Sequence, residues 1–439
     1  MKWYQKEDIA AIIIGFLIVF CISILWFYDL SFVYKALSVK LTSWQGLKLS
    51  LAFKNSSLLN FVLLYVFLSV LFGVCALLLR YKLSHFMAGF SVLFLLAILV
   101  LLCSSHSFIK SLQIDAPLIA LILGLLISNF FTIPTWFKNS LTTEFYVKTG
   151  IVIMGGSIPL ILLFNAGIVA IIEACIVTIV TFFTILFVAN KIFKLESSFG
   201  ATLAAGGSIC GVSAAIVIGN ACKAKQEHIS ATISIVIFWA VLMVLVLPFV
   251  CKTLNLDAGV AGAFIGTSEF ADAAGMAAAA SLSDDRAIAA FTIIKVLGRD
   301  MFIGVWAVLV AFLSITYWDK QKNEQKISVK TIFEKLPKFI LGFIGLCLFI
   351  AAFTMFLDES KFKLFQKEAL SSVKAFRDFI FILTFLCIGL STKFKTILSV
   401  GYKPFIAFSI GVAVNLPLGF LLSSYIFADF WTNFLIKGR

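Results

Sequence analysis

The chain has 439 residues, of which 62% are hydrophobic and 13% charged, with a net charge of +13. Soluble globular proteins carry about 25% charged residues, and a fold in water needs a polar surface, so this composition excludes a water-soluble protein. The apolar runs are long and do not alternate with polar residues, which excludes a β-barrel and predicts an all-α polytopic membrane protein.

About thirteen apolar segments follow one another along the chain, and the chain is expected to form about 11–13 transmembrane segments, each of about 20 residues. The first is too long for a signal-peptide core and is read as a retained helix. In chain order the segments are 9–28, 58–79, 86–103, 116–133, 145–164, 167–189, 198–219, 229–250, 259–280, 287–316, 337–357, 370–391 and 403–427.

The segment at 198–219 is rich in Gly, Ala and Ser, and Gly206–Ser213 is poor in helix formers. An unwound backbone survives at membrane depth only where it lines a cavity or is buried in protein. It would expose N–H groups at a helix N-terminus, which suits an anion. The alternative is close packing of helices through small residues. The candidate substrate-binding residues here are Gly206, Gly207, Ser208, Ile209, Cys210, Gly211 and Ser213.

The segment at 259–280 carries two carboxylates, Glu269 and Asp272, which are three residues apart and so share one helical face. Ionisable residues inside a membrane are costly and functional by default, so both are candidate ion-coupling groups. Thr267 and Ser268 beside them are candidate substrate-binding residues. The alternative is that this stretch is a loop near the surface.

Two bases, Lys295 and Arg299, lie four apart inside the run 287–316 and share a face. They are candidate substrate-binding residues that would receive an anion. Alternatively, they neutralise Glu269 and Asp272 in a structural ion-pair network. A further acid, Glu173, stands alone in the segment 167–189 and is a weaker candidate for proton coupling.

A pattern of Gly-x-Ser followed by Gly about ten residues later occurs at 155–167 and again at 389–401. An odd number of predicted segments separates the copies, so they would have opposite orientation. Inverted repeats with discontinuous helices are typical of secondary transporters. The fold is therefore expected to contain inverted repeats and two discontinuous, broken helices, at 198–219 and 259–280.

Other chemistries find little support in the sequence. Most of the nine Cys lie in apolar segments, and no His, Cys and carboxylate cluster has metal-ligand spacing. Cys210 has no His near it in sequence to act as a base, and no phosphate-binding Gly-x-x-x-x-Gly-Lys loop occurs. We therefore expect no catalytic residue, no metal and no cofactor, apart from coupling to Na⁺ or H⁺.

At these residues the sequence resembles the YeiH family, whose proposed activity is sulfate export. The stretch Gly206–Ser213 with the following Ala214-Ala215 is similar to the family's Gly-x-Ser-Ile-Cys-Gly-x-Ser-Ala signature, and Gly389–Thr392 resembles its C-terminal signature. The chain differs from the family pattern at Ser268 and Asp272, and in the four-residue spacing of Lys295 and Arg299. The resemblance covers about 117–427, so residues 1–115 form an N-terminal transmembrane extension and 116–439 a transporter unit with repeats at about 116–250 and 259–427.

This resemblance implies a secondary transporter, an exporter or exchanger of a small anion such as sulfate or a sulfonate, driven by an ion gradient. The alternatives are a Na⁺/H⁺-type cation antiporter using Asp272 and a Na⁺-coupled organic-anion symporter. An enzyme is not expected. The expected partners are a small inorganic or organic anion, the lipid bilayer and a second copy of the chain in a homodimer, with no nucleic acid. The expected location is the bacterial inner (plasma) membrane.

Overall fold

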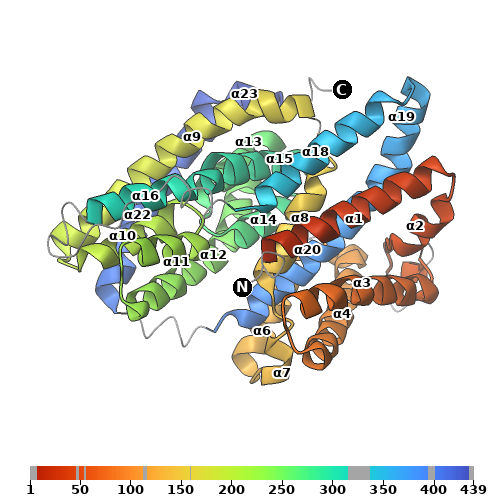
Figure 1. Ribbon diagram of the computed structural model, residues 1–439, viewed down its shortest axis with the longest axis horizontal. Coiled ribbons are helices and arrows are strands. Elements are labelled where there is room, and N and C mark those ends of the chain that lie inside the picture. Colours follow the sequence, from red (N-terminus) through yellow and green to blue (C-terminus); the bar gives the residue numbers. More distant parts are fainter. Residues whose placement is uncertain are drawn as a thin grey trace. The chain divides into compact units, whose positions relative to one another are not determined.

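The computed structural model describes residues 7–45, 49–53, 56–111, 116–158, 160–314, 337–393 and 401–434. Every regular element in these ranges is a helix (Figure 1), which confirms the predicted all-α class. The chain divides into two compact units, one formed by 1–160 with 338–392 and the other by 161–337 with 393–439. The predicted boundary at residue 115 stays a prediction.

Among the described residues, seven helical stretches are long and apolar enough to cross a membrane, as expected for a multi-pass protein. Four further apolar helices are shorter. The long stretches are Glu7–Phe27, Leu58–Leu78, Leu83–Ser105, Ala166–Ile192, Gln226–Thr253, Asp285–Leu313 and Tyr402–Ile426. The shorter ones are Ala116–Phe130, Val212–Ala221, Ala258–Ser268 and Phe339–Met355.

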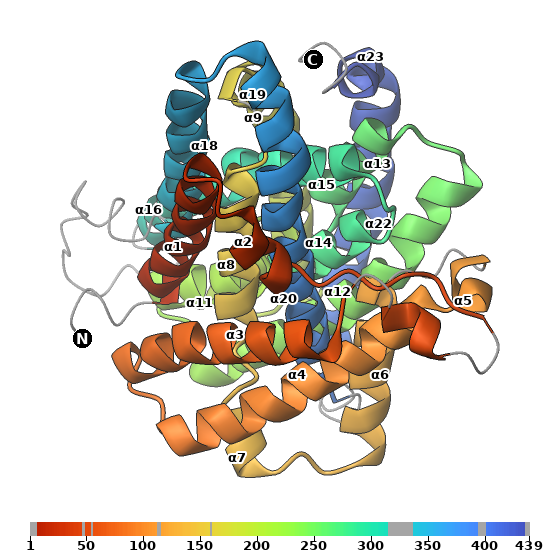
Figure 2. The same cartoon turned by 90° about the vertical axis from the view of Figure 1, so that its right-hand side faces the viewer.

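The first unit is built around helices α8 and α20, which pack against each other and against α1, α6 and α18. Small residues bring the backbones together, since a Cβ on Gly124 would lie 2.8 Å from the carbonyl oxygen of Leu386. Helices α3 and α4 lie side by side (Figure 2). The α-helices of this unit are α1 (Glu7–Phe27), α2 (Ser31–Leu37), α3 (Leu58–Leu78), α4 (Leu83–Ser105), α5 (Ser107–Ser111), α6 (Ala116–Phe130), α7 (Thr135–Lys138), α8 (Thr143–Gly155), α18 (Phe339–Met355), α19 (Glu359–Phe365) and α20 (Ser371–Ser391).

The second unit contains both segments that were predicted to be broken. Each is interrupted by three non-helical residues, at Ile209–Gly211 and at Glu269–Ala271, which confirms the two discontinuous segments. The helices of this unit are α9 (Leu160–Phe187), η3 (Val188–Ile192), α10 (Ser197–Ser208), α11 (Val212–Ala221), α12 (Gln226–Thr253), α13 (Ala258–Ser268), α14 (Asp272–Ala280), α15 (Asp285–Thr292), η4 (Ile293–Arg299), η5 (Asp300–Phe302), α16 (Ile303–Leu313), α22 (Tyr402–Leu421), η8 (Leu422–Ile426) and α23 (Ala428–Thr432).

Helices α9 and α22 lie antiparallel within this unit. Asn415 donates to Thr181, while Ser423, just beyond α22, donates to the buried Glu173. Thr181 and Asn415 are 234 residues apart, the spacing of the predicted repeat, so the contact joins two positions that the repeat would make equivalent. The repeat itself stays a prediction.

Candidate functional site

The first broken segment, α10–α11, folds back on itself as a hairpin, here called hairpin 1 (Figure 1). Its end contacts its beginning, because the thiol of Cys222 donates to the carbonyl of Ser198 at 3.5 Å. Lys225, just after the hairpin, pairs with Glu196, just before it, at 2.9 Å. The two ends of hairpin 1 therefore meet, and its turn at Ile209–Gly211 forms the tip.

The second broken segment, α13–α14, is closed in the same way and is called hairpin 2. Arg286, at the start of α15, pairs at 3.0 Å with Asp257, which caps the start of α13. The ends of hairpin 2 therefore also meet, and Glu269–Ala271 forms its tip. Hairpin 1 precedes the start of α12 and hairpin 2 follows its end, so the two enter from opposite ends of that helix.

Closure of hairpin 2 gives a stability prediction. Asp257→Ala removes both the ion pair with Arg286 and the cap on the Gly259 N–H, so we expect it to lower the free energy of unfolding by about 1–2 kcal/mol. The matched control is Asp358→Ala, which removes a similar cap from α19. Thermal unfolding of the two purified variants checks this. An equal or smaller loss in Asp257→Ala would show that the ion pair does not close the hairpin.

Both tips lie at mid-depth of the neighbouring spanning helices. A Cβ on Gly211 would lie 3.0 Å from Val236 of α12, and Val236 is about ten residues, or about 15 Å, into that helix. Lys295, which binds both tips, is about as far from the start of α15.

The two tips touch each other. A Cβ on Gly211 would lie 3.1 Å from the carbonyl oxygen of Phe270 and 3.3 Å from Cα of Ala271. Gly211 has φ +64, a conformation that only glycine adopts without strain. The glycine is therefore needed both for the turn of hairpin 1 and for its contact with hairpin 2.

Arg299 binds the carbonyl ends of both hairpins. Its Nε and Nη2 donate to the carbonyl of Ser208 at 3.1 and 2.8 Å. Its Nη1 donates to the carbonyls of Gly266, Thr267 and Glu269 at 2.8–3.1 Å. The last carbonyls of a helix have no partner inside the helix, and here one buried guanidinium binds the last carbonyl of α10 and two of the last carbonyls of α13.

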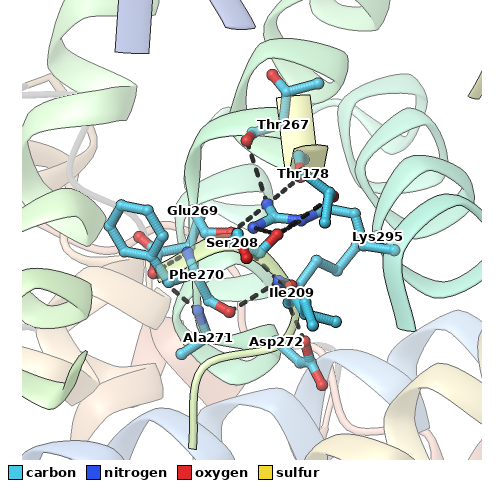
Figure 3. Close-up of polar contacts among 11 residues, drawn as sticks. Thr178, Ser208, Ile209, Thr267, Glu269, Phe270, Ala271, Asp272 and Lys295 are labelled. Carbon is cyan, nitrogen blue, oxygen red and sulfur yellow. Dashed lines mark hydrogen bonds and ion pairs between the residues drawn. The ribbon is translucent and has the colours of Figure 1, made fainter. Parts of the chain in front are cut away.

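Lys295, like Arg299, donates hydrogen bonds to both hairpins (Figure 3). Its ammonium donates to the carbonyls of Ile209 at 2.8 Å and Phe270 at 2.7 Å, and more weakly to that of Glu269 at 3.3 Å. It also pairs with Oδ1 of Asp272 at the longer distance of 3.5 Å. The ammonium thus lies closer to backbone carbonyls than to this predicted acid.

Glu269 closes the tip of hairpin 2. Its Oε1 accepts from the N–H groups of Phe270 and Ala271 at 2.9 and 3.1 Å, while its Oε2 is buried without a hydrogen-bond partner among the described residues. Asp300 is also buried and follows Arg299 directly. Together with the partly exposed Asp272, the ionisable side chains here comprise three carboxyl groups and two bases.

The remaining residues of hairpin 1 that were predicted to bind substrate differ from one another in their surroundings. Gly206 faces Thr232 and Val236, and Gly207 faces Ile185 and Phe408, so both allow close packing. The hydroxyl of Ser208 donates to the carbonyl of Ala204 within its own helix. Cys210 is buried, whereas Ser213 is partly exposed at the start of α11. The structure therefore brings Ile209–Gly211 together with Thr267–Asp272, Lys295 and Arg299 at the tips.

Three polar residues at the tips were not among the predicted site residues. Thr178 of α9 donates to the carbonyl of Ser208 at 3.2 Å. Asn415 of α22 donates to Thr181 at 3.0 Å and to the carbonyl of Thr267 at 3.3 Å. Asn415 interrupts an apolar run, which is a signal for such a role, but the threonines are too common in membrane helices to stand out.

The described part of the chain has no group of three or more metal-ligating His, Cys, Asp or Glu.

Comparison with known proteins identifies relatives of this chain. Residues 88–408 match the family model described as conserved hypothetical protein 698. A UPF0324 membrane protein of Rhodopirellula baltica is 32% identical over 351 residues, covering 78% of this chain and 64% of its own length. One from Nitratidesulfovibrio vulgaris is 28% identical over 83% of this chain and 63% of its own length. This chain thus spans less than two thirds of these two relatives.

A UPF0324 membrane protein of Nitrosomonas europaea is 25% identical and is matched along 92% of its length and 91% of this chain. No solved structure matches the chain. The relatives carry the description of membrane proteins and no named substrate.

Proposed function

This chain belongs to the family of conserved hypothetical protein 698, the YeiH family that its motifs resemble, and we propose that it is a secondary transporter of a small anion. The substrate class is sulfate or a sulfonate, and the transporter acts in the bacterial inner membrane, driven by an ion gradient. The two hairpin tips that meet at mid-depth form the binding site, as in other carriers whose half-helices end at the membrane midplane.

One observation supports an anion above all. Lys295 and Arg299 occupy the carbonyl ends of α10 and α13, so the helix ends that remain at the tips are the N-termini of α11 and α14. Helix N-termini carry a partial positive charge and free N–H groups. Val212, Ser213 and Asp272 are partly exposed there. The first turn of α14 carries Asp272, whereas α11 begins with Val212 and has no acid of its own.

The charge of the buried group supports ion coupling. Glu269, Asp272 and Asp300 outnumber Lys295 and Arg299 by one, so the group is negative when all five are ionised. An anion entering from water would add to this charge in a medium of low dielectric constant, where repulsion is strong. A proton or Na⁺ that enters with the anion offsets the repulsion.

Flux into proteoliposomes tests the proposal. We expect labelled sulfate or a sulfonate to be exchanged or driven by a Na⁺ or pH gradient. Val212→Asp should reduce flux at least about tenfold, because it gives α11 the carboxylate that α14 already has and repels the anion. Val212→Asn is the matched neutral control and should keep most of the flux. Absence of flux for every small anion, under either gradient, would refute the proposal.

A cation antiporter that uses Asp272 is the second candidate, because this carboxylate is partly exposed at the tips and lies 3.5 Å from Lys295. It predicts proton flux that depends on Na⁺ and is lost in Asp272→Asn. Under this alternative, no anion would be exchanged. Organic carboxylates added to the same flux assay distinguish a Na⁺-coupled organic-anion symporter from a sulfate carrier.

A further inference from the structure

The carboxyl group of Glu173 is buried in α9, within a stretch that is long and apolar enough to cross a membrane. Its side chain is 0% exposed. Its Oε1 accepts from the hydroxyl of Ser423 in η8, and its Oε2 accepts from Nε1 of Trp431 in α23 at 2.9 Å. Both partners are neutral, and the proposed anion site at the hairpin tips does not use this carboxyl group.

The elements around Glu173 give it no cation as a partner. Helix α13, which packs against η8 and α23, has no ionisable side chain, and Asp429 of α23 is exposed. Lys295 and Arg299 of η4 donate to the hairpin tips instead. The other ionisable groups of these elements and of the base of hairpin 2 are Cys175, Asp257, Arg286, Asp300 and Tyr425. Glu173 therefore forms no ion pair with any residue that the structure describes.

The two hydrogen bonds of Glu173 fit a protonated carboxyl group. An ionised carboxylate without a cation is costly to bury, and such a group becomes neutral instead. The indole N–H of Trp431 can only donate, so it fixes Oε2 as an acceptor and leaves Oε1 for the proton. The hydroxyl of Ser423 can accept from that proton when its own hydrogen turns to a helix carbonyl. The carboxyl group can therefore hold a proton without any movement of heavy atoms.

Helix α23 covers Glu173 and also packs on hairpin 2. The side chain of Trp431 is 0% exposed, and its ring lies 5.4 Å from that of Phe434. The backbone carbonyl of Trp431 lies directly against Gly259 in the first turn of α13, where any Cβ would collide with it. The N–H of Gly259 donates to Asp257, which closes the base of hairpin 2. A movement of α23 would therefore both admit water to Glu173 and free the base of hairpin 2.

We propose that Glu173 binds the proton that couples transport to a pH gradient, and that α23 is the cover that controls its exchange with water. The proposal rests on the proposed function, for which it names the coupling ion. Loss of the proton to water leaves a carboxylate that requires solvation, so α23 moves away and releases hairpin 2. Thr178, about 7.5 Å further along α9, contacts the carbonyl of Ser208 at the tips, so the same helix contacts both sites.

Hydrogen–deuterium exchange of the detergent-purified full-length protein tests the cover. Peptides that include 428–434 are compared between the wild type and Glu173→Gln at the same pH, because intrinsic exchange also depends on pH. Glutamine imitates the protonated acid, since it keeps an acceptor for Trp431 and a donor for Ser423. Between about pH 5 and about pH 9 we expect protection to fall at least about tenfold in the wild type, because the closed form retains the proton, and to stay high in Glu173→Gln.

The matched control is Asp429→Asn, which neutralises the exposed carboxyl group of the same short helix. It should show the pH response of the wild type. The same pH response in the wild type and in Glu173→Gln would overturn the proton site. The wild type alone can also overturn it, if the segment stays fully protected at the higher pH.

Flux into proteoliposomes separates the proton site from the proposed function. We expect a pH gradient to drive anion uptake in the wild type and Glu173→Gln to reduce this uptake at least about tenfold. Protection of α23 that depends on pH and on Glu173, without any anion flux, would retain the proton site and refute anion transport. Anion flux that ignores the pH gradient, together with equal exchange in both proteins, would retain anion transport and refute the proton site.

Discussion

Replacing Arg299 with Ala is expected to destabilise the protein by about 3–5 kcal/mol and to abolish transport. The guanidinium is 1% exposed and donates five hydrogen bonds to four carbonyls from both hairpins. Without it those carbonyls are buried with fewer partners, and the buried carboxyl groups lose a positive charge, each a known source of large destabilisation. The melting temperature and the yield of monodisperse protein in detergent measure the effect.

Two further variants test whether the loss in Arg299→Ala comes from the hydrogen bonds of the guanidinium. Arg299→Lys keeps the charge but not the planar fork of donors, so it should recover only part of the stability. Arg286→Ala is the matched control, because this arginine is 27% exposed and pairs with Asp257 and Asp284 near the end of hairpin 2. It should cost about 1 kcal/mol. A melting temperature of Arg299→Ala equal to that of Arg286→Ala would contradict the role given to the guanidinium.

Replacing Gly211 with Ala is expected to have an effect of similar size on transport. An alanine at φ +64 is strained, and its Cβ would lie 3.0 Å from Val236 and 3.1 Å from the carbonyl oxygen of Phe270. Hairpin 1 must then change its turn or move away from hairpin 2. We expect a loss of about 2–3 kcal/mol in stability and flux below about a tenth of the wild type.

Gly167→Ala is the matched control, because Gly167 is helical and a Cβ there would meet no atom within 4 Å. Alanine favours the helix by up to about 1 kcal/mol, so this variant should be as stable as the wild type or more so. Parallel measurements of melting and flux on both variants test the comparison. Wild-type flux in Gly211→Ala would show that contact between the two tips is not needed.

The sequence alone predicts where the two segments break but not that they fold back. Glycine and serine in Gly206–Ser213 predict a break because they are poor helix formers, and the structure confirms it. A hairpin and a crossing helix can have the same length and composition, so hydropathy does not separate them. In the structure the ends of each hairpin carry an ion pair, Glu196 with Lys225 and Asp257 with Arg286, and these residues look like ordinary loop charges in the sequence.

The role of Lys295 and Arg299 also could not be predicted in full from the sequence. Lys295 and Arg299 were predicted to share a face and to contact an anion or the nearby carboxylates. Both lie in the π-helix η4, where the period differs from 3.6 residues, and both donate to carbonyl groups. Free carbonyls at helix ends exist only once the helices break in three dimensions, so no residue type in the sequence marks them as partners.

Lys295 and Arg299 donate unequal numbers of hydrogen bonds to the two hairpins. Lys295 and Arg299 hold hairpin 1 by three bonds and hairpin 2 by five. Both bases also belong to the helix that directly follows hairpin 2, so they would travel with it. A separation of the two tips would therefore break the three bonds to hairpin 1 and keep the five bonds to hairpin 2.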